Sequence, residues 1–165
     1  SPDGLYLFDL DITLSRIQTA ARFIKKFDIK KVIVYSGRTY ATTPIEKFCE
    51  LTGAKMMLGR FMPGTLTNPS LPFYIEPQLI IISDPRVDSQ AVTEATNAGI
   101  PVIGIANTDN ITSKLDLIIP ANNRGRKSLA TVYWLLAREI LQDSKAMKYE
   151  IVDFETKTTD VEEEL

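Results

Sequence analysis

"LIIISDPRVDSQAVTEATNAGIPVIGIA", residues 79–106, is the stretch that decides the fold of this 165-residue chain. It opens with an apolar run at 79–83, continues through a helical pattern at 88–99 and ends in a second apolar run at 101–106. Asp88 suits the start of that helix and Gly99 suits its end. A strand, a helix and a strand in this order, with both strands apolar throughout, predict a βαβ unit in a parallel sheet that is buried on both faces.

The same alternation extends in both directions along the chain. Apolar runs at 4–10, 30–36, 54–58 and 115–120 predict further strands, and helical periods starting at Leu14, at 43–53 and at 127–142 predict the helices between them. We therefore expect an α/β fold with one domain, in which a mainly parallel sheet is covered by helices on both faces. Flavodoxin-like and Rossmann-like proteins have this architecture.

Composition excludes several classes of function. The chain has no histidine and a single cysteine, Cys49, which excludes histidine-based catalysis and an internal disulfide and makes a zinc site untenable. No apolar run approaches the roughly 20 residues that a membrane span needs. We expect no metal, no other cofactor and no membrane contact.

Charge is distributed unevenly along the chain. Residues 149–165 hold seven acidic residues and one basic residue, whereas the remaining 148 residues carry a net charge of +4. This difference predicts a folded domain over 1–148 and an acidic, disordered tail over 149–165. The basic body is suited to a polyanionic partner, although an ordinary charged surface would give the same balance.

Residues 5–16, "LYLFDLDITLSR", raise an alternative function. A haloacid-dehalogenase-type magnesium-dependent phosphatase would use Asp9 as its nucleophile and Asp11 as its acid/base group. It would also need phosphate and metal ligands, for which the chain offers Ser36, Lys55, Asp84 and Asp88. Against this hypothesis, the helical pattern begins at Leu14 and leaves no room for a flap that closes the site. Capping of that helix by Asp11 or Thr13, after a strand that ends near Asp9, would explain the same residues.

Residues 59–78, "GRFMPGTLTNPSLPFYIEPQ", contain four prolines and two glycines and predict a long irregular loop. Loops of this length inside a compact domain are usually functional or held by partners. Its apolar side chains favour a protein-docking surface, and packing over the edge of the sheet is the competing interpretation. The candidate protein-interface residues are Phe61, Met62, Leu66, Phe73 and Tyr74.

Four segments share distinctive sequence motifs with one known family. They are PIEKFCELTGAK (44–55), GRFMPGTLTNP (59–69), EPQLIIISDPRVDSQAVTEATNAGIPVIGIANTDN (76–110) and DLIIPANNRGRKSLATVYWLLARE (116–139). Together they closely resemble the ribosomal protein S-two family, in the archaeal/eukaryotic type that is related to the laminin-receptor precursor of animals. Bacterial members carry a coiled-coil insertion after the first helix, and the direct passage from helix to strand at 27–31 leaves no space for one.

The resemblance implies a structural constituent of the small ribosomal subunit and no catalysis. It implies a cytoplasmic, ribosomal location, a role in translation and subunit assembly, and no small-molecule substrate. The implied partners are small-subunit rRNA and neighbouring ribosomal proteins.

Proteins of this kind bind RNA mainly through phosphates, using basic, amide and backbone N–H groups. The densest candidate cluster is the turn at 122–127, which lies at a predicted helix N-terminus where free N–H groups favour a phosphate. A solvated turn with helix caps would be the structural alternative there. The candidate RNA-binding residues are Arg38, Tyr40, Arg60, Asn122, Asn123, Arg124, Arg126 and Lys127.

Overall fold

A five-stranded sheet forms the centre of the protein. The computed structural model describes residues 2–107 and 114–157, with side chains from residue 11 onward except that of Ser144. Neighbouring strands are parallel throughout, in the order β2-β1-β3-β4-β5. The strands are β1 (Val32–Ser36), β2 (Lys55–Leu58), β3 (Leu79–Ile82), β4 (Val102–Ala106) and β5 (Leu117–Pro120). This is the strand order of flavodoxin-like folds, so the predicted fold class is confirmed.

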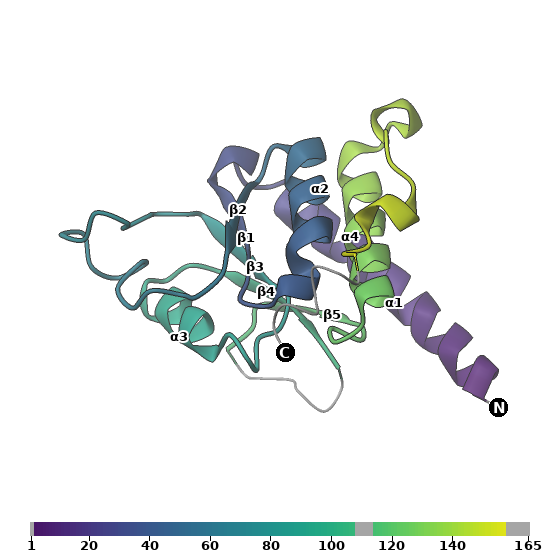
Figure 1. The fold of residues 1–165 in the computed structure, drawn as a ribbon, viewed down its shortest axis with the longest axis horizontal. Helices are drawn as coiled ribbons and strands as arrows, with labels where there is room; N and C mark the ends of the chain where they lie inside the picture. Colours follow the sequence, from purple (N-terminus) through teal and green to yellow (C-terminus); the bar gives the residue numbers. More distant parts are fainter. Residues whose placement is uncertain (1, 108–113, 158–165) are drawn as a thin grey trace.

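Helices cover both faces of the sheet, as expected for parallel strands that are apolar on both sides. Helices α1 (Pro2–Ile24), α2 (Thr42–Thr52) and α4 (Arg126–Leu141) pack on one face. Helix α3 (Ser89–Asn97) lies on the other face with the loop 59–78 (Figure 1). Short 3₁₀ helices are η1 (Ile29–Lys31), η2 (Thr39–Ala41), η4 (Ser144–Ala146) and η5 (Ile151–Phe154).

Alternate residues of each inner strand serve two separate cores. In β1, Val32 and Val34 face α1, α2 and α4, whereas Ile33 and Tyr35 face α3 and the loop 59–78. The first core is the larger of the two and includes Cys49, which is buried as predicted. The period of two along a strand therefore specifies which layer each side chain joins.

The predicted first strand at 4–10 is wrong, because residues 2–24 form the single helix α1. No proline or glycine lies between Gly4 and Ile24, so nothing in the sequence ends the helix that the pattern from Leu14 requires. A short apolar run does not distinguish a strand from a helix segment. The expected capping is wrong as well, since the Thr13 hydroxyl donates a hydrogen bond to the Pro120 carbonyl and so joins α1 to β5.

Residues 149–157, which we call the strap, run back across α2 and α4. Phe154 is fully buried in the larger core, and the Trp134 indole donates a 2.8 Å hydrogen bond to the Tyr149 carbonyl. The Tyr149 hydroxyl donates to Glu50 of α2 at 2.8 Å. The prediction of disorder from residue 149 is therefore wrong for this part, because an aromatic anchor holds the strap down. Residues 158–165 lie outside the described residues, and the domain boundary at 148 stays a prediction.

Candidate nucleic-acid interface

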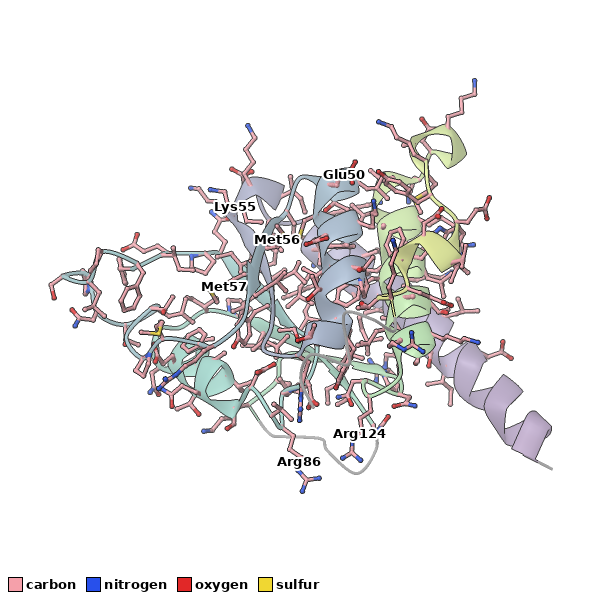
Figure 2. All side chains as sticks on the ribbon, in the orientation of Figure 1. Glu50, Lys55, Met56, Met57, Arg86 and Arg124 are labelled. Atoms are coloured by element: carbon pink, nitrogen blue, oxygen red, sulfur yellow. The ribbon has the colours of Figure 1, made fainter. Side chains whose placement is uncertain are left out.

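The carboxyl ends of the five parallel strands meet at one edge of the sheet. Four strands are followed there by exposed basic side chains, and neighbouring strands are about 4.8 Å apart, so this row spans about 19 Å. We call these residues the carboxyl-edge patch: Arg38 after β1, Arg60 after β2, Arg86 after β3, and Arg124 and Lys127 after β5. Figure 2 shows Arg86 and Arg124 projecting on the same side of the molecule, away from Lys55 at the opposite edge.

Arg86 belongs to the patch, although it is not among the RNA-binding residues predicted from the sequence. The bend after β3 exposes it. Asp84 is buried beneath this turn, where its carboxylate accepts a 3.3 Å hydrogen bond from the Val87 amide and so closes the turn. The signal that could have found Arg86 is its position directly after a βαβ strand, where ligands of open α/β sheets bind.

The predicted cluster at 122–127 contains two kinds of residue. Asn123 is fully buried, and its side-chain amide donates a 2.7 Å hydrogen bond to the Ile105 carbonyl at the end of β4. Arg126 is half-buried and donates at 3.1 Å to the Thr156 carbonyl of the strap. Both side chains are engaged within the fold, which favours a structural role for them, and their RNA contacts stay a prediction. Asn122, Arg124 and Lys127 are exposed, and the Asn122 side chain accepts a 2.9 Å bond from the Arg124 amide.

The remaining predicted RNA-binding residues, which follow β1 and β2, also differ in burial. Tyr40 is half-buried against the larger core, and its carbonyl accepts a 2.6 Å hydrogen bond from the Thr156 hydroxyl. That packing makes a structural role for Tyr40 the better interpretation than base stacking. Arg38 and Arg60 are exposed, so they are available to a partner at the surface.

A buried carboxylate lies beneath Arg38. Asp88 is 7% exposed, and its Oδ2 accepts a 3.2 Å hydrogen bond from the Gly37 amide. Burial raises the pKa of Asp88 to about 6, and the negative charge of Asp84 adds to this rise. The hydrogen bond from the Gly37 amide and the positive charge of Arg38 oppose it. A Cβ on Gly37 would lie 2.7 Å from Oδ1 of Asp88, so a larger residue there would force the Asp88 carboxylate to shift. Asp88 thereby ties the β1–α2 loop to the β3–α3 turn.

The residues of the phosphatase hypothesis do not assemble into a site. Asp9 and Asp11 lie within α1 instead of at the end of a strand, and Asp11 is exposed. Lys55 is at the amino end of β2, across the length of the sheet from the buried Asp84. Among the described side chains there is no group of three histidine, cysteine or acidic residues that could hold a metal ion. The geometry gives the aspartyl phosphatase no support.

The proline-rich loop (residues 59–78) folds over the sheet as part of the second core. Phe61 packs edge-to-face on Tyr35 with ring centroids 5.5 Å apart, and Leu66 is 2% exposed. Both are core residues, so the packing favours the competing interpretation, and their interface role stays a prediction. Met62 and Phe73 remain exposed, at 46% and 38%, whereas Tyr74 is half-buried and donates from its hydroxyl to Glu76 at 2.8 Å.

A buried carboxylate from α3 holds the proline-rich loop in place. Glu94 accepts hydrogen bonds from the Gly64 amide at 2.9 Å, from the Leu66 amide at 3.3 Å and from the Thr67 hydroxyl at 3.4 Å. The Gln90 side chain donates a further bond at 2.9 Å. Burial would raise the pKa of Glu94, but these donors outweigh it and hold the pKa below its usual range. The loop is thus a packed element despite its lack of regular structure.

No helix in the described ranges 2–107 and 114–157 has both the length and the hydropathy of a membrane span.

Comparison with known proteins gives a consistent result. A family model described as ribosomal protein S2 matches residues 73–143. The chain is 69% identical to the small ribosomal subunit protein uS2 of Nitrosopumilus maritimus, over 98% of this chain and 81% of that protein. It is 60% identical to the protein of the same name from Cenarchaeum symbiosum, over 94% of this chain and 78% of that protein. For the uS2 protein of Thermoplasma acidophilum the identity is 48%, over 94% and 81% of the two chains.

Proposed function

The chain belongs to the ribosomal protein S2 family, and from that premise we propose that its carboxyl-edge patch binds small-subunit rRNA. As a member of this family the protein is a structural constituent of the small ribosomal subunit and not an enzyme. We place its work in translation and subunit assembly on the cytoplasmic ribosome.

The observation that carries the proposal is the row of exposed basic side chains along one edge of the sheet. RNA helices are recognised mainly through phosphates and shape, and several cations at fixed spacing suit that mode of binding. Arg124 and Lys127 flank the start of α4, which has no side-chain cap on its first amides. Free N–H groups at a helix N-terminus add a phosphate site to the two cations.

The test replaces two exposed basic residues of the patch by alanine. Arg124→Ala with Lys127→Ala leaves Asn123 and Arg126 in place, so the turn keeps its bonds to Ile105 and Thr156. We expect weaker association with small subunits that lack this protein, and a salt slope reduced by about one for each phosphate that the variant no longer neutralises. The measurement is sedimentation with subunits over a range of salt concentrations.

A matched control removes the same charge from the opposite edge. Lys30→Ala with Lys31→Ala changes two exposed lysines of η1, which precedes β1. This control should leave both the affinity and the salt slope unchanged. If both double variants lose the same affinity for small subunits, the effect depends on net charge alone, and the assignment of the patch is refuted.

A second contact surface is supported by a different observation. Met62 and Phe73 expose apolar surface on the proline-rich loop, which Glu94 and the core hold in one conformation. We assign these two side chains to a neighbouring ribosomal protein, because a held loop contacts a partner without the cost of ordering. Met62→Ser with Phe73→Ser should weaken incorporation into subunits at high salt. Val152→Ser is the control, since Val152 is 65% exposed and lies on the strap; an equal effect there would contradict the assignment.

A further inference from the structure

Thr156 of the strap joins two parts of the carboxyl-edge patch. It is 1% exposed, and its hydroxyl donates to the Tyr40 carbonyl at 2.6 Å and accepts from the Thr43 amide at 3.4 Å. Its carbonyl accepts the 3.1 Å hydrogen bond from Arg126. One buried residue therefore bonds to the β1–α2 connection and to the first turn of α4 at the same time.

The sheet by itself holds these two parts of the patch together only indirectly. Strand β1, which precedes Arg38, is separated from β5, which precedes Arg124 and Lys127, by β3 and β4. Three strand spacings of about 4.8 Å put the two strand ends about 14 Å apart. All three basic residues lie beyond the strand ends, within two residues of Tyr40 or Arg126. The bonds of Thr156 link the connections that carry them.

The rest of the strap holds Thr156 in place. Phe154 is fully buried in the larger core. In the capping box of η5, the side chains of Glu150 and Asp153 each accept a hydrogen bond from the backbone amide of the other. The Trp134 indole bonds the Tyr149 carbonyl at the beginning of the strap. The strap is therefore a folded element that fixes Thr156 against two other elements.

We propose that Thr156 is a positioning residue, which fixes Arg38 relative to Arg124 and Lys127 and so makes the patch selective for duplex RNA. A rigid A-form duplex presents its phosphates at fixed spacing, so cations that are already held in place bind it without the cost of ordering. A flexible single strand adapts to cations in many arrangements and gains less from a fixed patch. This inference rests on the proposed function and names the class of RNA that the patch binds.

The burial of Tyr40 supports the choice of duplex over single-stranded RNA. Single strands are bound largely by stacking of their bases on aromatic side chains. Tyr40, the aromatic residue in the connection that carries Arg38, is half-buried against the larger core instead of presented to a base. The exposed groups of this connection and of the turn before α4 are suited to phosphates.

The test compares two fluorescein-labelled probes, an A-form RNA duplex and a single-stranded oligouridine with the same number of phosphates. Thr156→Val keeps the shape of the side chain but removes the hydroxyl that bonds Tyr40 and Thr43. We expect duplex affinity to fall by about two- to ten-fold, which corresponds to ordering one long side chain on binding, while single-strand affinity changes by less than about two-fold. An unchanged ratio of the two affinities would overturn the inference.

Two further variants separate positioning from the stability of the strap. Thr156→Ser keeps the hydroxyl and should restore the preference for the duplex. Tyr149→Phe removes the hydrogen bond from the strap to Glu50, about 10 Å along α2 from Thr43, and should leave the ratio of affinities unchanged. If Tyr149→Phe lowers the ratio as much as Thr156→Val does, general loosening of the strap explains the effect and the inference is refuted.

Amide NMR relaxation measures the positioning without RNA. Order parameters of about 0.85 mark a rigid backbone. Those of the Arg38 and Arg124 amides should be lower in Thr156→Val than in the unchanged chain, whereas those of β3 should stay the same. Equal values at Arg38 and Arg124 would contradict the positioning role. If Thr156→Val does not fold, Phe154→Leu, which loosens the anchor of the strap, takes its place with the same expected changes.

The two proposals fail differently. If Arg124→Ala with Lys127→Ala binds the duplex and the small subunit as well as the unchanged chain does, the patch is not an RNA surface and the proposed function fails. If that variant loses affinity while Thr156→Val keeps the full preference for the duplex, the RNA surface stands and only the positioning role is wrong.

Discussion

The buried carboxylate of Glu94 predicts a large loss of stability from a single isosteric change. Glu94→Gln keeps the shape of the side chain but removes its charge inside the proline-rich loop. Two backbone amides, of Gly64 and Leu66, then lose a charged acceptor at 2.9 and 3.3 Å. Hydrogen bonds to charged groups contribute about 1.5–3 kcal/mol to stability and neutral ones about 0.5–1.5 kcal/mol. Glu94→Gln should therefore lower the free energy of unfolding by about 1–3 kcal/mol at pH 7.

The sign of the pH dependence follows from the lowered pKa of Glu94. A carboxylate whose pKa is lower in the folded state stabilises the fold at every pH above its unfolded pKa. That contribution is lost as the pH falls through the lowered folded pKa. The difference in stability between Glu94→Gln and the unchanged chain should therefore be largest at neutral pH and vanish in acid.

Urea denaturation and amide hydrogen exchange measure these two consequences. We expect a lower midpoint at pH 7, and faster exchange of the Gly64 and Leu66 amides than of amides in β3. Glu46→Gln is the matched control, because Glu46 is exposed on α2 and its loss removes the same charge. The reasoning is refuted if Glu94→Gln stays within about 0.5 kcal/mol of the unchanged chain, the range of ordinary surface substitutions.

Three further predictions concern other buried groups. Asp88→Asn should stabilise the protein by up to about 3 kcal/mol at pH 8, because the pKa of Asp88 is raised to about 6 and ionising this carboxyl costs stability as the pH rises. Urea midpoints at pH 8 and pH 4 measure this, and an equal gain at both would contradict it. Thr13→Val should lower the free energy of unfolding, measured by thermal denaturation, by about 1–2 kcal/mol, because it leaves the Pro120 carbonyl without the α1 donor. Thr19→Val, which loses only bonds within its own helix, is the control. Cys49 should resist a thiol reagent at pH 8 in the native protein and react once the chain unfolds, because burial raises its pKa to about 12; rapid native labelling would refute this.

The parallel sheet could be predicted because its signals are local. Each strand of the βαβ unit at 79–106 is an unbroken apolar run, and Gly53 ends α2 with a positive φ of 90°, which glycine adopts without strain. The prolines of the loop 59–78 likewise exclude regular structure whatever the rest of the chain does. The resemblance between segments then supplied the family, which composition alone could not.

The features that could not be predicted depend on contacts between distant parts of the chain. Thr13 meets Pro120 across 107 positions, and Thr156 meets Tyr40 across 116. No local pattern indicates that Asn123 is buried under β4 while its neighbour Arg124 is exposed, since both are polar residues in one turn. The same limit explains the predicted strand at 4–10, because a short apolar run fits a helix equally well.

Sedimentation with small ribosomal subunits tests the central claim most directly. Subunits depleted of this protein are mixed with the purified chain, and the bound fraction is measured at rising salt concentrations. The account predicts co-migration at physiological salt that weakens steadily as salt rises, with a smaller slope for Arg124→Ala, Lys127→Ala. Free migration of the unchanged chain at physiological salt would contradict it.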